Sequence, residues 1–314
     1  MKRKVMWWTR ATCAGVLCAM ACTAYAAEHR EMNVTVTSDR KVSGFVHPES
    51  VAFDPDEKVL YVSEFGSVLR PTLKDGKGRI SKVSLEGRVI EKHCLPIGHD
   101  ILHKPKGIWI EGDRLWVTDI DAVWIFDLDT RRGKKVILPD ALFANDPTVM
   151  KDSLYVSDST KKCIYRITPA DFLSENVSPH VAIYGTTLSF GPNGLFPAAD
   201  GDTLLVAGYS TEEQEYGVYA IESCESLSTV VRNLGMLDGL VQLDDGSIMV
   251  TDWKSQSLIL WHRKGGLKTL ATDFRGPADF CVVPDKGGLL VVVPDLVVGD
   301  LRFIRLEIKG SSPD

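Results

Sequence analysis

The sequence predicts an all-β protein, a six-bladed β-propeller, and two observations lead to this prediction. First, a unit of short apolar strands separated by turn residues recurs along the chain, with no helical segment between the strands of a unit. Consecutive short strands without crossover helices pair antiparallel. Second, the unit occurs six times. Six four-stranded sheets arranged radially around a channel bury the apolar faces of such units economically.

The clearest copy of the unit spans residues 237–253. An apolar run at 240–243 meets Asp244-Asp245-Gly246, a turn signal in which glycine supplies a positive φ. A second apolar run at 248–250 ends at Thr251-Asp252, and a third follows at 258–261. This order predicts three consecutive strands of one blade.

The spacing of the six copies agrees with a propeller. Their first motif residues stand at 48, 105, 145, 192, 237 and 277, with steps of 57, 40, 47, 45 and 40. Propeller blades usually repeat every ~40–50 residues. Residues 33–37 alternate as a strand ahead of the first copy, and the last copy has only three strands of its own. We therefore expect 33–37 to pair with 301–308 and close the ring.

The N-terminus predicts export. Residues 1–26 combine a basic start, a short apolar stretch and the Ala24-Tyr25-Ala26 cleavage pattern of a secretory signal peptide. The apolar stretch is too short for a membrane span. The expected mature protein is a single propeller domain of residues 27–314, periplasmic or secreted, with no membrane association after cleavage.

The net charge of the mature chain bears on the class of partner, and its cysteine content bears on disulfide formation. Removal of the four basic residues of the signal leaves 32 basic against 42 acidic residues, so the formal net charge changes from −6 to −10. An acidic surface argues against nucleic-acid binding. Four cysteines remain, on four different copies, and we expect mostly unpaired, buried thiols: Cys94, Cys163, Cys224 and Cys281.

The candidate site is a ring at the start of the six inner strands. These strands line the channel, so their opening side chains converge on its axis. Alignment of the copies gives a set rich in carboxylate and amide oxygens, which suit calcium or another hard divalent ion. Two alternatives without a metal remain. The channel could be polar and filled with water, or Lys106 could neutralise the acidic side chains. The aligned residues are Glu49, Lys106, Asp146 with Asn145 beside it, Asn193, Asp238, and Ala278 with Asp279 beside it.

Two other patterns favour structural roles. His93, Cys94, His99 and His103 have spacings that hint at zinc, but no second cluster completes a ligand set, so a connector between blades is the preferred interpretation. The Ser-Asp and Thr-Asp pairs that end second strands are expected to cap loop backbone donors. They are Thr118-Asp119, Ser157-Asp158 and Thr251-Asp252.

Four motifs in register resemble the regucalcin/gluconolactonase-like (senescence marker protein) family, especially its exported bacterial members. They cover nearly all of the mature chain: Pro48-Glu49-Ser50-Val51-Ala52-Phe53-Asp54, Asn145-Asp146, Pro192-Asn193-Gly194-Leu195 and Leu237-Asp238-Gly239. The resemblance implies a divalent metal held by Glu49, Asn193 and Asp238, with Asn145 contacting the substrate. Calcium is the expected ion, with zinc, manganese or magnesium as alternatives.

The resemblance also implies lactone hydrolysis, in which the ion polarises the carbonyl and a carboxylate draws a proton from water. We expect Asp238 to serve as ligand and base with Asp146 behind it, and Lys106 to contact a small-molecule substrate. Sugar-lactonase members carry an arginine where this chain has Phe143, so gluconolactone itself is not assigned. The alternative is a non-catalytic ligand- or protein-binding propeller of NHL-repeat type, whose protein partner the sequence does not identify.

Overall fold

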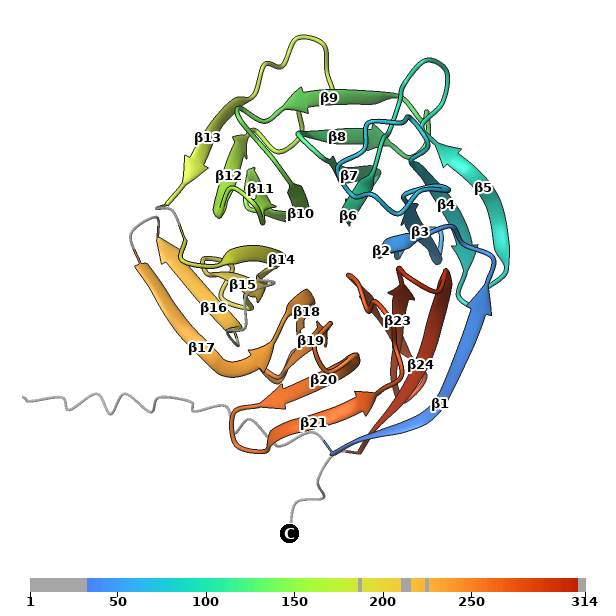
Figure 1. Ribbon diagram of the computed structural model, residues 1–314, viewed down its shortest axis with the longest axis vertical. Helices are drawn as coiled ribbons and strands as arrows, with labels where there is room; N and C mark the ends of the chain where they lie inside the picture. The colour runs from blue at the N-terminus through green and yellow to red at the C-terminus, as the bar shows by residue number, and fades with distance from the viewer. Residues whose placement is uncertain (1–32, 186–187, 210–215, 224–225, 310–314) are drawn as a thin grey trace, which may run out of the picture.

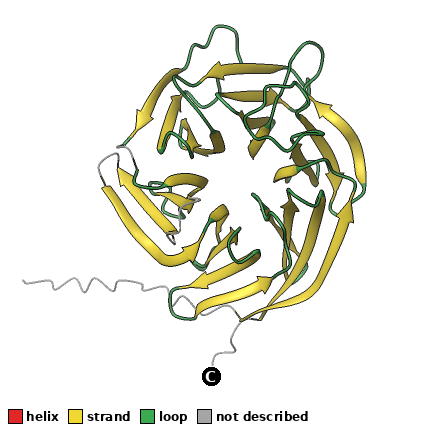
Figure 2. Cartoon of the chain, viewed as in Figure 1, coloured by secondary structure: helices red, strands yellow, loops and turns green. Residues whose placement is uncertain are grey.

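The computed structural model describes residues 33–185, 188–209, 216–223 and 226–309. Within these residues all regular structure is β, and the strands form six antiparallel sheets arranged as a ring around a central channel (Figures 1 and 2). The predicted six-bladed β-propeller is therefore confirmed. The predicted signal peptide, residues 1–26, lies outside the described residues.

The first three blades follow the chain order from the inner to the outer strand. Blade 1 contains β2 (Pro48–Asp54), β3 (Val59–Glu64), β4 (Arg79–Ser84) and β5 (Val89–Leu95). Blade 2 contains β6 (Pro105–Glu111), β7 (Arg114–Asp119), β8 (Ala122–Asp127) and β9 (Gly133–Ile137). Blade 3 contains β10 (Ala144–Met150), β11 (Ser153–Asp158), β12 (Cys163–Thr168) and β13 (His180–Tyr184).

Blades 4 and 5 repeat this order, whereas blade 6 takes its outer strand from the N-terminal part of the chain. Blade 4 contains β14 (Gly191–Pro197), β15 (Leu204–Tyr209), β16 (Tyr216–Ser223) and β17 (Ser226–Gly235). Blade 5 contains β18 (Leu237–Gln242), β19 (Ile248–Asp252), β20 (Ser257–His262) and β21 (Gly266–Ala271). Blade 6 contains β22 (Cys281–Asp285), β23 (Gly288–Asp295), β24 (Asp300–Lys309) and β1 (Asn33–Ser43).

Ring closure occurs where the sequence predicted it. β1 pairs antiparallel with β24, from Val34 opposite Ile308 to Val42 opposite Leu301, and the two strands lie side by side at the edge of the ring (Figure 1). The strand is longer than the predicted 33–37 segment. Val34 is buried in the apolar cluster between blades 5 and 6, so closure adds a core contact as well as a ladder.

Each pair of neighbouring blades shares an apolar core. Between blades 1 and 2, for example, Tyr61 and Ile80 pack with Leu115 and Val117. Such cores form because alternate side chains of a strand point to opposite faces, and both faces of a blade meet another blade. The blades therefore hold the inner strands at fixed positions around the channel.

A register shift at the start of five inner strands shapes the candidate site. The ladder between β10 and β11 is interrupted between Ala144 and Pro147, and β2, β6, β14 and β18 have the same irregularity at the equivalent position. A bulge frees consecutive residues from strict alternation and re-aims their side chains. Two successive residues of one inner strand therefore reach the channel.

The side chains that end the second strands cap the loops, as predicted. Asp158 accepts hydrogen bonds from the backbone N–H groups of Leu142 and Phe143, and Asp119 accepts those of His103 and Lys104. Asp252 accepts the N–H of Met236 in the same way. Each carboxylate thereby ties the loop that enters an inner strand to the second strand of the same blade.

The long loop between β3 and β4 is anchored over blade 2. The Lys104 side chain is fully buried, and its ammonium donates hydrogen bonds to the carbonyl oxygens of Phe65 and Val68 and to Asp75, over 2.8–3.0 Å. His103 Nδ1 also accepts the N–H of Gly76 at 3.0 Å. The His93–His103 segment is thus a connector that secures this loop.

The described cysteines are unpaired and buried, as expected: Cys94, Cys163 and Cys281. Cys224 lies outside the described residues. In the part of the chain that the structure covers, no helix has the length and apolar character needed to span a bilayer.

Candidate functional site

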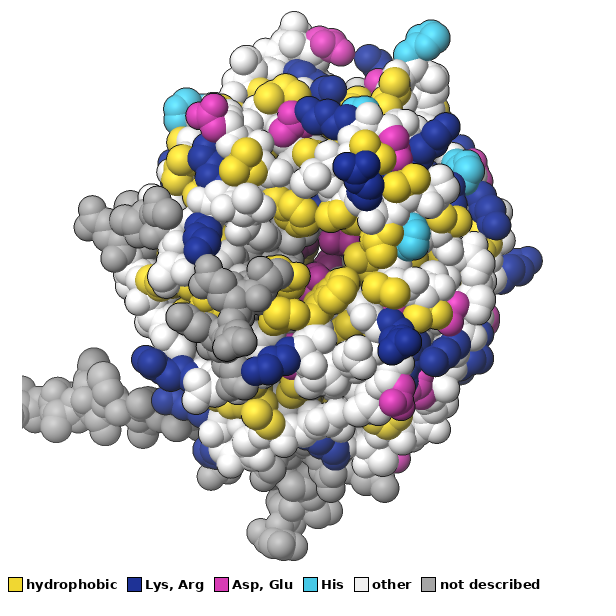
Figure 3. Space-filling view, in the orientation of Figure 1, with side chains coloured by type: hydrophobic (Ala, Val, Ile, Leu, Met, Phe, Trp, Pro, Cys, Tyr) yellow, Lys and Arg dark blue, Asp and Glu magenta, His cyan; other side chains and the backbone are white. Residues whose placement is uncertain are grey.

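Five polar side chains from five blades form a ring at one end of the channel. All are almost fully buried, with at most 6% of each residue exposed. The register places each of them directly after the last paired residue that precedes the register shift of an inner strand. They are Glu49 from β2, Lys106 from β6, Asn145 from β10, Asn193 from β14 and Asp238 from β18. In Figure 3, acidic side chains are visible at the bottom of a central opening framed by hydrophobic ones.

Hydrogen bonds fix the two amides of the ring. Asn145 Nδ2 donates to Asn193 Oδ1 at 2.6 Å and to Ser159 Oγ at 3.0 Å. Asn193 Nδ2 donates to the carbonyl oxygen of Leu237 at 3.3 Å. The N–H groups of Asn145 are therefore directed into the protein, and its oxygen is available to a bound group. The Asn193 oxygen already accepts one hydrogen bond and has one further lone pair for such a group.

The two carboxylates of the ring are less completely satisfied. Asp238 Oδ2 accepts a hydrogen bond from Trp253 Nε1 at 2.8 Å. Glu49 Oε2 is buried and has no hydrogen-bond partner. A buried oxygen left without a partner is costly, so its presence in a functional channel points to a group that the protein binds there.

Burial and mutual repulsion raise the pKa of both carboxyl groups. The pKa of Glu49 lies well above its usual value because of burial and then the neighbouring Asp238. Burial, followed by the charge of Asp279, raises the pKa of Asp238 to about 7. Since the ionised forms repel each other, a divalent cation between Glu49 and Asp238 would stabilise them.

Lys106 places a positive charge beside these acids. Burial lowers the pKa of its ammonium to about 8, and Glu49 gives the largest opposing effect. The Nζ atom lies 4.4 Å from the centroid of the Phe143 ring and 5.8 Å from that of Phe65. It also donates a long, 3.4 Å hydrogen bond to the carbonyl oxygen of Lys104. Phe143 thus contacts the one cation of the ring.

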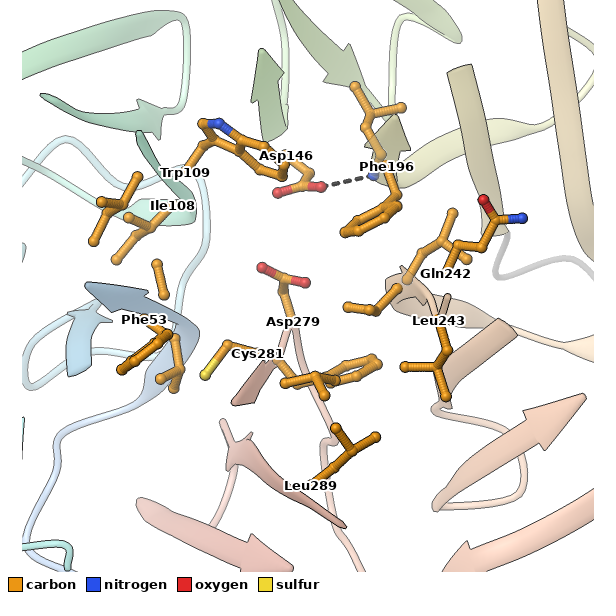
Figure 4. A pocket seen from close by; sticks show the side chains of 18 of the residues that line it. Phe53, Ile108, Trp109, Asp146, Phe196, Gln242, Leu243, Asp279, Cys281 and Leu289 are labelled. Atoms are coloured by element: carbon orange, nitrogen blue, oxygen red, sulfur yellow. Dashed lines mark hydrogen bonds between the residues drawn. The ribbon is translucent and has the colours of Figure 1, made fainter. Parts of the chain in front are cut away.

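A second layer of residues lies one position further along the inner strands. It contains two aspartates on opposite blades, Asp146 of blade 3 and Asp279 just before β22 of blade 6. Figure 4 shows their carboxylates pointing toward one another across the channel. Asp146 Oδ2 accepts the N–H of Leu195 at 2.6 Å, and Asp279 Oδ2 accepts the hydroxyl of Ser50 at 2.5 Å.

The structure thus brings together Glu49, Asn193 and Asp238, the predicted metal ligands, with Asn145 and Lys106. It does not place Asp146 level with them. The sequence alignment set Asp146 at the ring position, but Ala144 pairs with Asp158 just as Leu237 pairs with Asp252. Asn145 is consequently the equivalent of Asp238, because the bulge begins one residue earlier than the Asn-Asp motif suggests.

Asp279 was predicted only as a neighbour of the Ala278 ring position, and the side chains next to the ring residues were not predicted. Phe65, Ser159 and Trp253 each follow the residue that ends a second strand. A pattern was present, since the Glu64-Phe65, Asp158-Ser159 and Asp252-Trp253 pairs are equivalent in the repeat. The pattern could not be recognised in the sequence because Phe65, Ser159 and Trp253 differ in chemical character.

The ring fits a metal through its donor chemistry. Glu49 and Asp238 supply carboxylates, and Asn193 supplies an amide oxygen, the donor types that calcium prefers. Across the described residues, no three His, Cys, Asp or Glu side chains form a metal cluster, so the amide oxygen is needed to complete any site. The set is small enough to leave coordination positions for water and substrate.

Comparison with known proteins gives similarity of fold at low sequence identity. A candidate gluconolactonase structure matches with a TM-score of 0.63 and 15% identity, covering 88% of this chain and 94% of that chain. A streptogramin B lyase matches with a TM-score of 0.59 and 14% identity, over 87% and 98% of the two chains. The virginiamycin B lyase of Staphylococcus aureus matches with a TM-score of 0.55 and 11% identity, over 85% and 99%.

Comparison of the sequence with known proteins assigns neither a family nor a function to the chain. No family model and no curated protein matches the chain. At 11–15% identity the structural neighbours show a common propeller fold and its extent over nearly the whole of each chain. Function must therefore be argued from the ring itself.

Proposed function

We propose that the chain is a metal-dependent hydrolase that opens a lactone or related ester at the ring of Glu49, Asn193 and Asp238. The observation that carries the proposal is the buried, unpartnered Glu49 Oε2 close to a second carboxyl group whose pKa is raised to about 7. A channel closed only by packing would place apolar side chains here. The similarity in fold to a candidate gluconolactonase supports the same class of reaction.

Glu49, Asn193 and Asp238 would hold the ion, for which calcium is the proposed identity. When bound, a divalent cation supplies the positive charge that polarises the scissile carbonyl. Asp238 accepts the proton of the attacking water as general base, because the bound cation favours its ionised form. Asp146, one layer deeper, is the next acceptor for that proton. Its own pKa is raised by burial and then by Asp279.

Two residues position the substrate. The Asn145 amide donates both N–H groups to protein atoms, so its oxygen accepts a hydrogen bond from a substrate hydroxyl. The Lys106 ammonium approaches the substrate carbonyl or carboxylate and stabilises negative charge there. Because Phe143 rather than arginine contacts the same region, we propose a substrate less hydroxylated than a sugar lactone.

The decisive experiment combines metal analysis with a lactone panel. The purified protein should contain about one equivalent of divalent ion and hydrolyse at least one lactone. Asp238→Ala should lose both, together with the thermal stabilisation that excess ion gives through binding to the native state. Asp244→Ala, which alters an exposed aspartate on the same blade, should keep them. Unchanged metal content in Asp238→Ala would place any ion elsewhere, and inactivity on all lactones would favour a non-catalytic, NHL-type binding propeller.

Elimination is the competing reaction, because two of the structural neighbours are lyases. Hydrolysis transfers an oxygen atom from water to the product acid, whereas elimination breaks the alkyl–oxygen bond and leaves an alkene. Turnover in ¹⁸O-labelled water should therefore add one label to the product. An unlabelled, unsaturated product would show that the ring catalyses elimination instead.

A further inference from the structure

The opposite end of the channel contains a separate cavity of about 520 Å³ (Figure 4). The distal halves of the inner strands line it, and its wall is largely apolar, with four aromatic side chains among aliphatic ones: Phe53, Trp109, Phe196 and Phe280. Asp244 and Asp245 also line it. The Trp109 and Phe196 rings meet edge to face, with centroids 6.2 Å apart. A cavity of this size and character is typical of sites for small organic ligands.

Asp146 and Asp279 lie at the inner end of this cavity, and their carboxylates point into the channel from opposite blades (Figure 4). Each already accepts one hydrogen bond, from Leu195 N–H and from Ser50 Oγ respectively. Among the described residues, no lysine, arginine or histidine forms an ion pair with either carboxylate. The cavity therefore combines an apolar wall with two carboxyl groups that no cationic side chain of the described residues pairs with.

The glycines around the two aspartates show that this end is built to hold them. A Cβ atom on Gly107 would lie 2.2 Å from Asp146 Oδ1, and one on Gly239 would lie 2.9 Å from Asp279 Oδ1. A larger residue at Gly107 would have to displace the Asp146 carboxylate, and one at Gly239 would have to displace the Phe280 ring, 2.6 Å away, as well as Asp279. Two acids that repel each other are thus accommodated by a layer of small residues, although apolar side chains at these positions would pack the channel at lower electrostatic cost.

We infer that this cavity binds a small organic cation, a primary ammonium group carried on an apolar body. The ammonium lies between Asp146 and Asp279 and donates hydrogen bonds to both, while the apolar body packs among the aromatic rings. An ammonium offers three donors and a charge opposite to that of the acids. The aromatic faces stabilise a nearby cation further. The inference shares Asp146 with the proposed hydrolase but does not rest on it, since it uses neither the ring oxygens nor an ion.

The test compares two ligands of nearly equal shape, 4-phenylbutylammonium and 4-phenylbutan-1-ol, by calorimetry on the full-length mature protein with excess calcium present. The amine should bind with one-to-one stoichiometry, at least tenfold more tightly than the alcohol. Asp279→Asn should weaken amine binding at least tenfold and leave alcohol binding within about twofold. Trp109→Phe should remove the fluorescence change that the amine produces in the wild type.

Control variants locate the site. Asp238→Ala changes an acid of the ring that does not contact the proposed ammonium, and it should alter amine affinity much less than Asp279→Asn does. If Asp279→Asn fails to fold, Asp146→Asn tests the opposed carboxylate with the same expectation. Equal affinity for amine and alcohol, or amine binding lost in Asp238→Ala and retained in Asp279→Asn, would overturn the inference. Loss of one calcium equivalent in Asp279→Asn, together with displacement of the amine by calcium, would identify a metal site instead.

Discussion

Lys106 experiences two opposing influences within the ring. Burial disfavours its charged form, and Glu49 together with the rings of Phe65 and Phe143 favours it. Its pKa of about 8 keeps most of the side chain protonated at neutral pH. An ammonium held in this way can stabilise an oxyanion without forming a tight ion pair with the acids.

Replacement of this ammonium tests its role. Lys106→Met should lower kcat/KM on the hydrolysed lactone about 10–100-fold, since it removes one electrophilic contact, with the metal content unchanged. The measurement is steady-state kinetics paired with elemental analysis, and Lys74→Met, at an exposed position, serves as a control. A variant that binds metal more tightly than an inactive wild type would show that Lys106 blocks the site. Equal metal affinity and equal lactone turnover in the wild type and Lys106→Met would show that Lys106 neither assists catalysis nor blocks the site.

The raised pKa values of Asp238 and Asp279 predict how the stability of the metal-free protein varies with pH. Both groups titrate near pH 7 in the folded protein, against a usual value of 3.8. A folded pKa above the unfolded one adds stability that is fully present below about pH 4 and is lost as the pH rises through about 7. The free energy of unfolding should fall by an amount on the order of a few kcal/mol over this range.

Urea unfolding of the chelator-treated protein at pH 5 and pH 8 measures this loss. Asp238→Asn should reduce the difference because the amide does not ionise, whereas Asp244→Asn should preserve it. Saturating calcium should stabilise the protein chiefly at pH 8, where the carboxylates are ionised. A stability that rises between pH 5 and pH 8 in the metal-free protein would contradict the electrostatic description of the ring.

Much of the ring could be predicted from the sequence because its residues recur at a fixed place in each repeat. Glu49, Asn193 and Asp238 were aligned correctly in this way. Asp146 was placed one residue out of register, and Asp279 was placed only beside the Ala278 ring position, because bulges decide which of two adjacent residues faces the axis. The apolar sequence surroundings of a bulge do not reveal where it begins.

At the scale of elements, the loop between β3 and β4 depends on one buried lysine. Lys104→Met should destabilise the protein by about 2–4 kcal/mol, because the Phe65 and Val68 carbonyls and Asp75 would lose a shared donor. Chemical unfolding would measure the loss, and limited proteolysis should cut within residues 65–78.

The matched control is Lys74→Met in the same loop. Lys74 pairs with Asp121, and the two side chains are 52% and 33% exposed, so its loss should change stability by less than about 1 kcal/mol. Equal effects of the two substitutions would mean that the Lys104 contacts do not hold the loop.

Strands and turns were largely predictable because their signals are local. Alternation and Asp-Asp-Gly turns located the hairpins, and the Thr-Asp and Ser-Asp pairs correctly indicated loop capping. The role of Lys104 was not predictable. Its three acceptors lie 29–39 positions earlier in the chain, and no local pattern connects a lysine to the carbonyls of another blade's loop.

At the scale of the whole molecule, β1 holds the ring closed. Val34 and Thr35 are neighbours on this strand, the first buried and the second exposed. Val34→Ala should therefore lower the free energy of unfolding by about 2 kcal/mol through a lost core contact, and Thr35→Ala should change it by less than about 0.5 kcal/mol. Thermal unfolding of the two variants side by side makes the comparison, and equal melting temperatures would refute a core role for β1.

The pairing of β1 with β24 also determines when the newly made chain can complete its fold. Thr37 donates a hydrogen bond to the carbonyl oxygen of Arg305, 268 positions later, so β1 remains unpaired during synthesis until β24 has been made. Until then its backbone edge is open, and an open edge invites pairing with other chains. The charged residues Asp39, Arg40 and Lys41 within this strand discourage such pairing. The pairing of β1 with β24 is therefore the step that completes the propeller.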